Sequence, residues 1–535
     1  MAHDKNEVTK LIHSRLDRWQ FAVLIFVVVY AIFLTINMNN ITMQWDEVNH
    51  FNGALLLIRG QILQYVAINS YYPPVFNLVT AAYFALGGAS VLAGRLVALT
   101  FSVLSMYVVY QIGKETYSKK TGLVSAVLFA VMPGIVLLSS TAMIETMLIF
   151  VFSTSMLFFF RWLRTSLKRD VIVSVVAFMV GIAVKYQTLV LAPIIVIFGL
   201  LVLGKGDVLK AQISGFVHSR RLWLGVGLAA VAAALLYAFY ASGLLSVWLY
   251  VMQIGNSGQV WYSNRFPTPI FYLIEMVWPY HDKHPISLLL YGLALAGLAL
   301  LVYRRKPQDK FLFIWFLATL IVFTFIPNRQ WRYVTLLFPV LAISAAELVT
   351  LAYSKAERSW KSAENYLTKK RIAKFAAALL ILFTAIGVFY SCMDAYVWVA
   401  GDQSHVPIEQ ATEYIAPRVI AHQSVIVLCP YNLFNKDMVW FYLNSKSPSQ
   451  TQVYQYPELP VDAYTPEFDV TAFMNFCETN NTRYVMLYEY GGTIPYFNSN
   501  LTEQAVYGML NGTRRFTQEA TFGTEPERIF LMSFK

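Results

Sequence analysis

The segment QWDEVNHFNGALLLIRGQ at 44–61 carries a carboxylate pair, an amide and an imidazole within one potential helix. Asn49 and His50 follow Asp46 by three and four residues, so a helix presents all three on one face and turns Glu47 about 100° away. A carboxylate held there can act as a general base toward a hydroxyl. Acids at a helix start also simply favour the N-terminal dipole, and the sequence alone leaves both interpretations open.

Four further ionisable residues lie at the ends of apolar runs. They are Glu145 in SSTAMIETML, Lys185 in GIAVKYQ, and Arg329 and Arg332 in PNRQWRY, where Tyr333 follows the second arginine. Such cations can bind a phosphate through charge-assisted hydrogen bonds. They also commonly snorkel or anchor helix ends at a membrane interface. The phosphate hypothesis therefore depends on all of them facing the same side as the acids.

No cofactor is required by these residues, although a divalent metal is possible. The HDKH turn at 281–284 offers two histidines and an acid that could bind one. An exposed polar turn explains the same residues more simply.

The composition indicates an integral membrane protein. Of the 535 residues 57% are hydrophobic and 13% charged, against about 25% charged in a soluble protein. The net charge of +11 belongs to residues 1–398, which carry 33 basic and 16 acidic side chains, whereas the tail is acidic. Basic clusters between apolar segments are typical of cytoplasmic loops, so nucleic acid is excluded as a partner.

The apolar runs predict about eleven transmembrane helices. They are expected near 21–38, 91–112, 121–140, 146–162, 171–185, 187–203, 222–241, 286–303, 311–326, 334–352 and 375–398.

The basic residues orient this arrangement. With a cytoplasmic N-terminus, 26 Lys and Arg fall inside and 7 fall outside before the tail, as the positive-inside rule requires. The four Asn-X-Ser/Thr sequons, at Asn40, Asn480, Asn500 and Asn511, then all lie outside, where such sequons are modified.

Three parts follow along the chain. We expect residues 1–20 to form a cytoplasmic N-terminus and residues 21–398 to form the transmembrane domain. The first outer loop of this domain, at 39–90, is expected to hold helices that lie on the membrane surface. In one of them, at 44–61, the apolar face would rest on the bilayer. Residues 399–535 alternate strand-like and helix-like runs, which predicts a small extracytoplasmic α/β domain. The strands are expected at 425–429, 484–490 and 528–534, and the helices at 438–443, 472–476 and 503–510.

Several of these segments, in the same order, resemble one family. The segments are the WDE start, YYPPVFNLVTAAYFALGG, the acid in SSTAMIETML, the lysine in GIAVKYQ and the late RQWRY. Over about residues 20–350 the chain resembles the dolichyl-phosphate-mannose protein mannosyltransferase and aminoarabinose transferase branch of the GT-C glycosyltransferases. The resemblance implies a polytopic α-helical GT-C fold. It also implies transfer of one sugar, with inversion, from a polyprenyl (dolichyl-type) phosphate to an acceptor on the outer or lumenal face.

The resemblance also implies site residues. Asp46, with Glu47 beside it, matches the catalytic aspartate, and Glu145 matches the second acidic position. Lys185 and the two arginines of RQWRY, Arg329 and Arg332, match phosphate-contacting positions. Departures from the family pattern are Tyr72 before the Pro-Pro step, where a basic residue is common, Asn49 in place of an arginine, and Glu145 in place of an aspartate. These departures weaken the inference about which residues contact the phosphate and which acceptor is used more than the inference about the type of reaction.

Two alternatives remain at the level of sequence. An oligosaccharyltransferase-like enzyme would share the architecture and need a divalent metal, but the tail lacks a WWDYG-type motif. A lipid-sugar flippase or transporter would explain the spans but not the outer carboxylates. The expected partners are the lipid-phosphate donor, membrane lipids and an acceptor that is a protein, a glycan or a lipid. The expected location is the cell membrane of a prokaryote, or the endoplasmic reticulum of a eukaryote.

Overall fold

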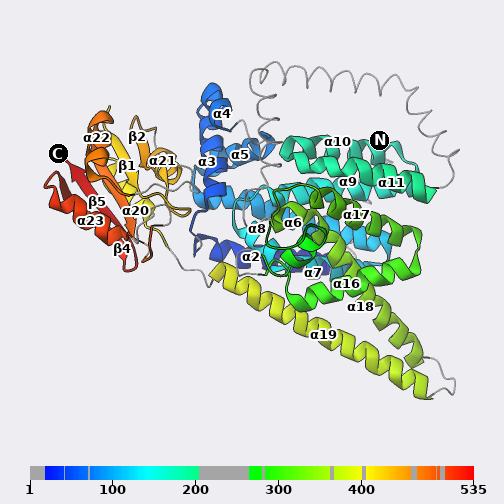
Figure 1. Cartoon of the computed structure of the whole chain (residues 1–535). Coiled ribbons are helices and arrows are strands. Elements are labelled where there is room, and N and C mark those ends of the chain that lie inside the picture. Colours follow the sequence, from blue (N-terminus) through cyan, green and yellow to red (C-terminus); the bar gives the residue numbers. More distant parts are fainter. Residues whose placement is uncertain are drawn as a thin grey trace, which may run out of the picture.

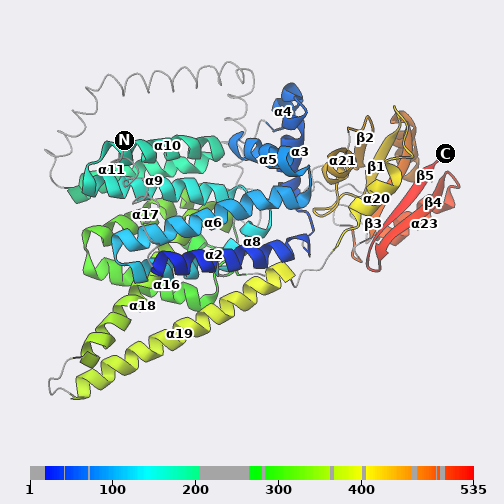
Figure 2. The same cartoon turned by 180° about the vertical axis from the view of Figure 1, so that it is seen from behind.

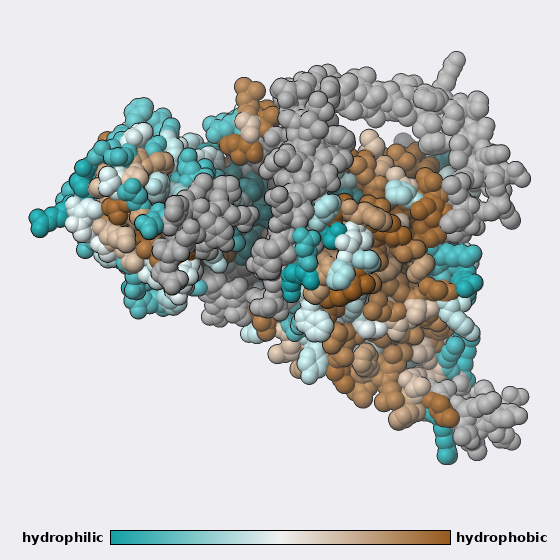
Figure 3. Space-filling view, in the orientation of Figure 1, coloured by the Kyte–Doolittle hydropathy of each residue, from teal (hydrophilic) through white to brown (hydrophobic). Residues whose placement is uncertain are grey.

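A helical bundle and a smaller domain built on a β-sheet stand end to end (Figure 1). The computed structural model describes residues 18–40, 42–69, 73–203, 264–279, 284–361, 367–400, 405–446, 448–458, 467–489, 491–494 and 501–535. Apolar side chains cover much of the bundle surface in Figure 3, whereas the surface of the smaller domain is largely polar. This contrast is what a bundle embedded in lipid and a domain in water require.

The bundle consists of long apolar helices and a few short ones between them. They are α2 (Arg18–Asn37), α6 (Val91–Thr116), α7 (Lys119–Ala130), α8 (Pro133–Ser140), α9 (Glu145–Thr165), α10 (Lys168–Val184), η2 (Tyr186–Val190), α11 (Leu191–Leu203), η4 (Thr268–Ile270), α15 (Phe271–Glu275), α16 (Leu288–Arg304), α17 (Pro307–Thr324), η5 (Trp331–Leu337), α18 (Phe338–Lys361) and α19 (Leu367–Ala400). Figure 2 shows α2 and α6 side by side and α19 along one edge.

The number of membrane crossings differs from the prediction in its details. Within the described ranges six helices are long and apolar enough to span a bilayer, or seven if α7 and α8, which meet at a bend of 66°, form one broken span. The spans expected near 171–185, 187–203 and 286–303 appear as helices of 17 residues or fewer. The span expected at 222–241 lies outside the described residues. The total of eleven therefore stays a prediction.

Three helices lie at the end of the bundle that faces the smaller domain: α3 (Trp45–Ile58), α4 (Ile62–Asn69) and α5 (Val75–Gly87). In both cartoon views α3 runs across the ends of the bundle helices (Figures 1 and 2). The prediction that the apolar face of α3 rests on the bilayer is wrong. Phe51 on that face is fully buried, with its ring 6.0 Å from Phe84 of α5 and 5.3 Å from Phe441 of the smaller domain. Protein side chains, not lipid, cover this face.

The smaller domain is a mixed sheet with helices, as the α/β pattern predicted. Its elements are α20 (Ile408–Ile415), β1 (Ser424–Leu428), α21 (Lys436–Ser445), β2 (Gln452–Tyr456), α22 (Val470–Thr479), β3 (Thr482–Glu489), α23 (Glu503–Gly512), β4 (Phe516–Thr524) and β5 (Glu527–Phe534). The strand order is β2-β1-β3-β5-β4. The central strand β3 pairs parallel with β1 and antiparallel with β5. The three predicted strands are confirmed, whereas the edge strands β2 and β4 and the helix α20 were missed.

Candidate active site

Asp46 and Arg332 form an ion pair between segments far apart in the chain. Asp46 lies in the first turn of α3 and Arg332 in η5, and Nη1 of the arginine is 2.5 Å from Oδ2 of the acid. The other terminal nitrogen of Arg332 donates to Gln330 at 3.2 Å. Both charged side chains remain partly exposed. The pair is therefore ordered yet accessible from outside the protein.

A second ion pair joins Glu145 and Lys185. Glu145 is the first residue of α9, Lys185 follows the last residue of α10, and their Nζ and Oε1 atoms are 2.9 Å apart. The lysine also lies 5.9 Å from the ring centre of Tyr333, the neighbour of Arg332, which is within the range of a cation-π contact. This contact brings the two ion pairs next to each other.

His50 completes the cluster from the same face of α3 as Asp46. Its Nδ1 donates to Oδ1 of Asn77 at 2.7 Å, so Nε2 carries no proton in the neutral ring. Burial lowers the pKa of His50 more than Asn77 and the neighbouring acids raise it. Burial alone would raise the pKa of Asp46, but Arg332 above all, with His50 and Lys185, holds that pKa below its usual range. At neutral pH the site therefore presents an ionised Asp46 and an uncharged imidazole.

Glu47 is directed away from this cluster, as the helical spacing predicted. Its two oxygens each lie 2.8 Å from a nitrogen of Arg95 on α6, and the pair is fully buried. The same carboxylate accepts from the backbone N–H groups of Ala142 and Gln44, both at 2.8 Å. Glu47 thus fastens the start of α3 to the bundle, directly beside Asp46. Arg95 lies inside the apolar run AGRLVAL, and an arginine in such a run indicates a buried partner.

The remaining predicted residues lie in different surroundings. Arg329 is buried, with its guanidinium 5.7 Å from the ring centre of Phe271 and Nε donating to the carbonyl of Ile326. Asn49 is half-buried in α3. Tyr72 lies outside the described residues, and of the HDKH turn only His284 is described. Within the described part of the chain, no three His, Cys, Asp or Glu side chains are placed to hold a metal ion.

The smaller domain contacts the helix that carries Asp46. Asn52 of α3 donates to the backbone carbonyl of Asp437 at 3.0 Å, and Nη1 of Arg59 donates to Oδ1 of Asn444 at 3.0 Å. Phe441 lies between these two contacts in sequence and packs on Phe51. No sequence pattern had indicated this contact, because it joins residues almost 400 positions apart.

α6 also packs on Phe51 of α3. A Cβ atom on Gly94 would lie 2.0 Å from the ring of Phe51, so only glycine fits there. The apolar face of α3 is therefore held between the bundle and the smaller domain.

Comparison with known proteins places this geometry in context. Residues 72–237, about a third of the chain, match the family described as dolichyl-phosphate-mannose-protein mannosyltransferase. A comparison with curated protein sequences finds no match.

Solved structures share the fold. ArnT from Cupriavidus metallidurans in the apo state has a TM-score of 0.57 at 12% identity, covering 95% of this chain and 97% of that one. The same enzyme bound to undecaprenyl phosphate has a TM-score of 0.55 at 13% identity, with the same coverage. The apo oligosaccharyltransferase of Archaeoglobus fulgidus has a TM-score of 0.51 at 15% identity, covering 87% of this chain and 69% of that one. These likenesses show that the chain has the GT-C fold of an integral membrane protein, and residues 72–237 are also similar to protein mannosyltransferases.

Proposed function

We propose that this protein is a membrane glycosyltransferase that transfers a single sugar from a polyprenyl (dolichyl-type) phosphate to an acceptor hydroxyl, with inversion at the anomeric carbon. The observation that carries the proposal is the placement of the Asp46 carboxylate beside the two cations Arg332 and Lys185. The matched family name and the ArnT complex with undecaprenyl phosphate support a lipid-phosphate donor.

In the reaction Asp46 acts as the general base. The acceptor oxygen forms a bond to the anomeric carbon while the bond from that carbon to the phosphate oxygen breaks. The proton of the acceptor passes to Asp46, and the bonding electron pair leaves with the polyprenyl phosphate. One displacement on the face opposite to the leaving group inverts the configuration, so a covalent sugar intermediate is not needed.

The phosphate leaves as a stable anion, so it needs cations rather than an acid. Arg332 and Lys185 supply them, and each is paired with a carboxylate in the structure. When the donor phosphate draws Arg332 toward itself, Asp46 loses the partner that contributes most to holding its pKa down. The carboxylate then becomes more basic at the moment when it must accept a proton. Donor binding thus raises the pKa of Asp46 and makes it a stronger general base.

We also propose that the N-terminus is cytoplasmic and the smaller domain extracytoplasmic. The 26-to-7 distribution of basic residues supports this orientation. It puts Asp46 and Glu145 at the outer surface, where a lipid-borne donor and a polar acceptor can meet. Glu145 would orient Lys185, while Asn49, Tyr72, Arg329 and Tyr333 remain proposed substrate contacts.

The decisive experiment compares Asp46→Asn with the intact protein in nanodiscs, without any ion gradient. A panel of polyprenyl-phosphate sugars and acceptors is supplied, and the products are identified by mass spectrometry. The variant keeps its shape but loses basicity, so the rate should fall about 10²- to 10⁴-fold while donor binding persists. Asp469→Asn is the matched control, because Asp469 caps α22 through hydrogen bonds that asparagine also forms.

Each alternative function has its own outcome in this experiment. Near-normal transfer by folded Asp46→Asn would refute the base assignment and make Glu145 the next candidate. Transfer of a preassembled oligosaccharide would indicate an oligosaccharyltransferase. Lipid movement between leaflets without any transfer would indicate a flippase.

A further inference from the structure

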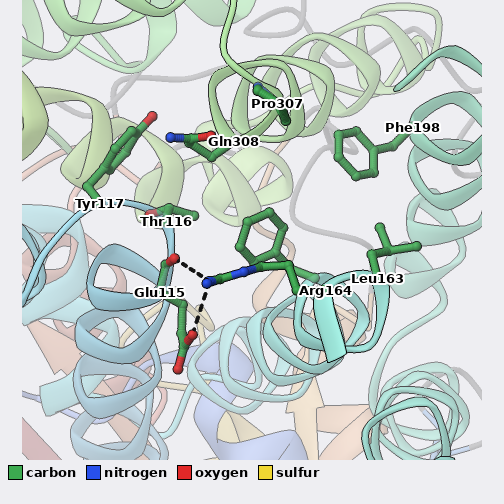
Figure 4. A pocket seen from close by; sticks show the side chains of 9 residues that line it. Glu115, Thr116, Tyr117, Leu163, Arg164, Phe198, Pro307 and Gln308 are labelled. Carbon is green, nitrogen blue, oxygen red and sulfur yellow. Dashed lines mark hydrogen bonds and ion pairs between the residues drawn. The ribbon is translucent and has the colours of Figure 1, made fainter. Parts of the chain in front are cut away.

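The bundle holds a pocket of about 470 Å³ (Figure 4). It is formed by the last turns of α6 and α9, the first turn of α17 and a side chain of α11. Glu145 begins α9 and Arg164 stands near its end, so the two sites are about 29 Å apart along this helix. That distance is close to the thickness of the hydrocarbon core of a bilayer. The pocket therefore lies at the membrane face opposite to the candidate active site.

One wall of the pocket is polar and positively charged. Nη1 of Arg164 donates to the backbone carbonyl of Glu115 at 2.8 Å and lies 3.3 Å from its carboxylate. Arg161 donates to the other oxygen of the same carboxylate at 3.1 Å. Two guanidinium groups thus share one acid, which leaves a net positive charge beside the amide of Gln308 and the hydroxyl of Thr116.

Further basic residues are close in sequence to the residues that line the pocket. Lys168 and Arg169 begin α10, directly after α9, and Arg305 and Lys306 precede α17; all four are exposed. The potential at this rim attracts anions.

The other wall is apolar. Phe160 and Leu163 come from α9 and Phe198 from α11. In Figure 4 Phe198 and Leu163 lie on one side, Thr116 and Glu115 lie on the other, and the Arg164 side chain extends between them. A free anion would use only the polar wall, and a neutral hydrocarbon only the apolar one. An amphiphile with a negatively charged head uses both.

We propose that this pocket binds the phosphate headgroup of an anionic membrane lipid from the leaflet opposite to the candidate active site. Arg164 contacts the phosphate, and the upper part of one acyl chain packs on Leu163 and Phe198. The volume suits a headgroup and the first part of a chain rather than a whole lipid, whose remaining length stays in the bilayer. The binding joins α6, α9, α11 and α17 at one point. It does not depend on the reaction proposed for Asp46.

The test uses the full-length protein in nonionic detergent, titrated with dioleoyl phosphatidylglycerol, dioleoyl phosphatidylcholine, dioleoylglycerol or inorganic phosphate. Binding is measured by native mass spectrometry and by the midpoint of thermal unfolding. The expected order of affinity is phosphatidylglycerol, then phosphatidylcholine, then dioleoylglycerol. Arg164→Gln should weaken phosphatidylglycerol binding about tenfold or more, because it removes a charge-assisted contact. Leu163→Trp should weaken it as well by filling the pocket, with no change in charge.

Two control variants locate the binding. Arg169→Gln removes an exposed charge that does not line the pocket, so it should weaken phosphatidylglycerol binding far less than Arg164→Gln does. Lys185→Ala changes only the remote site and should bind phosphatidylglycerol normally. Equal binding by Arg164→Gln, Leu163→Trp and the unchanged protein would overturn the proposal. It would also be overturned if inorganic phosphate gave the full stabilisation, if Arg169→Gln lost as much affinity as Arg164→Gln, or if Lys185→Ala abolished binding.

Discussion

The contact between Arg332 and Asp46 allows a prediction with two readouts. Replacing Arg332 by glutamine removes a charge-assisted contact to the donor phosphate, which is worth about 1.5 to 3 kcal/mol. Donor affinity should therefore fall about 10- to 100-fold. The same change removes the partner that does most to hold down the pKa of Asp46, so burial then raises that pKa.

The sign of the pH effect follows from the role of Asp46. A general base works only when it is deprotonated, so kcat/KM falls on the acid side at the pKa of the base in the free enzyme. Raising this pKa moves the acid limb of the profile to higher pH. The assay is the pH dependence of kcat/KM for sugar transfer, together with a donor-binding titration at fixed pH.

Two further variants sharpen this experiment. Arg332→Lys keeps the charge and should recover most of the normal pH profile but not the full donor affinity, because lysine cannot bind a phosphate with two parallel hydrogen bonds. Arg329→Gln, in the same segment, should leave the acid limb in place, since Arg329 packs over Phe271. If the acid limb of the kcat/KM profile of Arg332→Gln is unchanged, or lies at lower pH than that of the intact protein, Arg332 does not control the pKa of Asp46.

Three other predictions concern the framework around the site. Glu47→Gln should lower the free energy of unfolding by about 3 to 5 kcal/mol, because it leaves the buried Arg95 charge uncompensated; a midpoint of thermal unfolding equal to that of the intact protein would contradict this. Phe441→Ala should release the smaller domain from α3 at a cost of about 3 to 5 kcal/mol, seen as faster proteolytic cleavage near residue 400; unchanged cleavage would show that the ring is dispensable. Protease added to sealed right-side-out vesicles should remove residues 399–535, and full protection of that segment would reverse the proposed orientation.

Much of the architecture could be predicted because it follows from local patterns. Apolar runs marked the long helices, and the apolar runs 425–429, 484–490 and 528–534 marked the buried strands of the smaller domain. The edge strand β4 was missed because its sequence FTQEATFGT is mostly exposed and has too few apolar residues to show an alternation.

The site was only partly predictable. Helical spacing predicts that Asp46 and Glu47 point to different sides of α3. The positions of Glu145 and Lys185 at the ends of apolar runs indicate that both lie near the membrane surface. Which acid meets which cation depends on tertiary packing, since Arg332 is 286 residues from Asp46. For the same reason the sequence assigned the apolar face of α3 to the bilayer, because the ring that covers it comes from another part of the chain.

The burial of Phe51 under Phe441 has a consequence for biosynthesis. The two residues are 390 positions apart in the sequence, and ribosomes add about 5 to 20 residues per second, so α3 waits roughly 20 to 80 s for its cover. During that time its apolar face has no partner from the smaller domain. A chain that stops before α21 would keep this face open and lack the contacts of Phe51, Asn52 and Arg59 with the smaller domain. The nascent protein thus completes the packing of α3 only when α21 has been made, and a truncated product would expose an apolar surface of the kind that quality-control chaperones recognise.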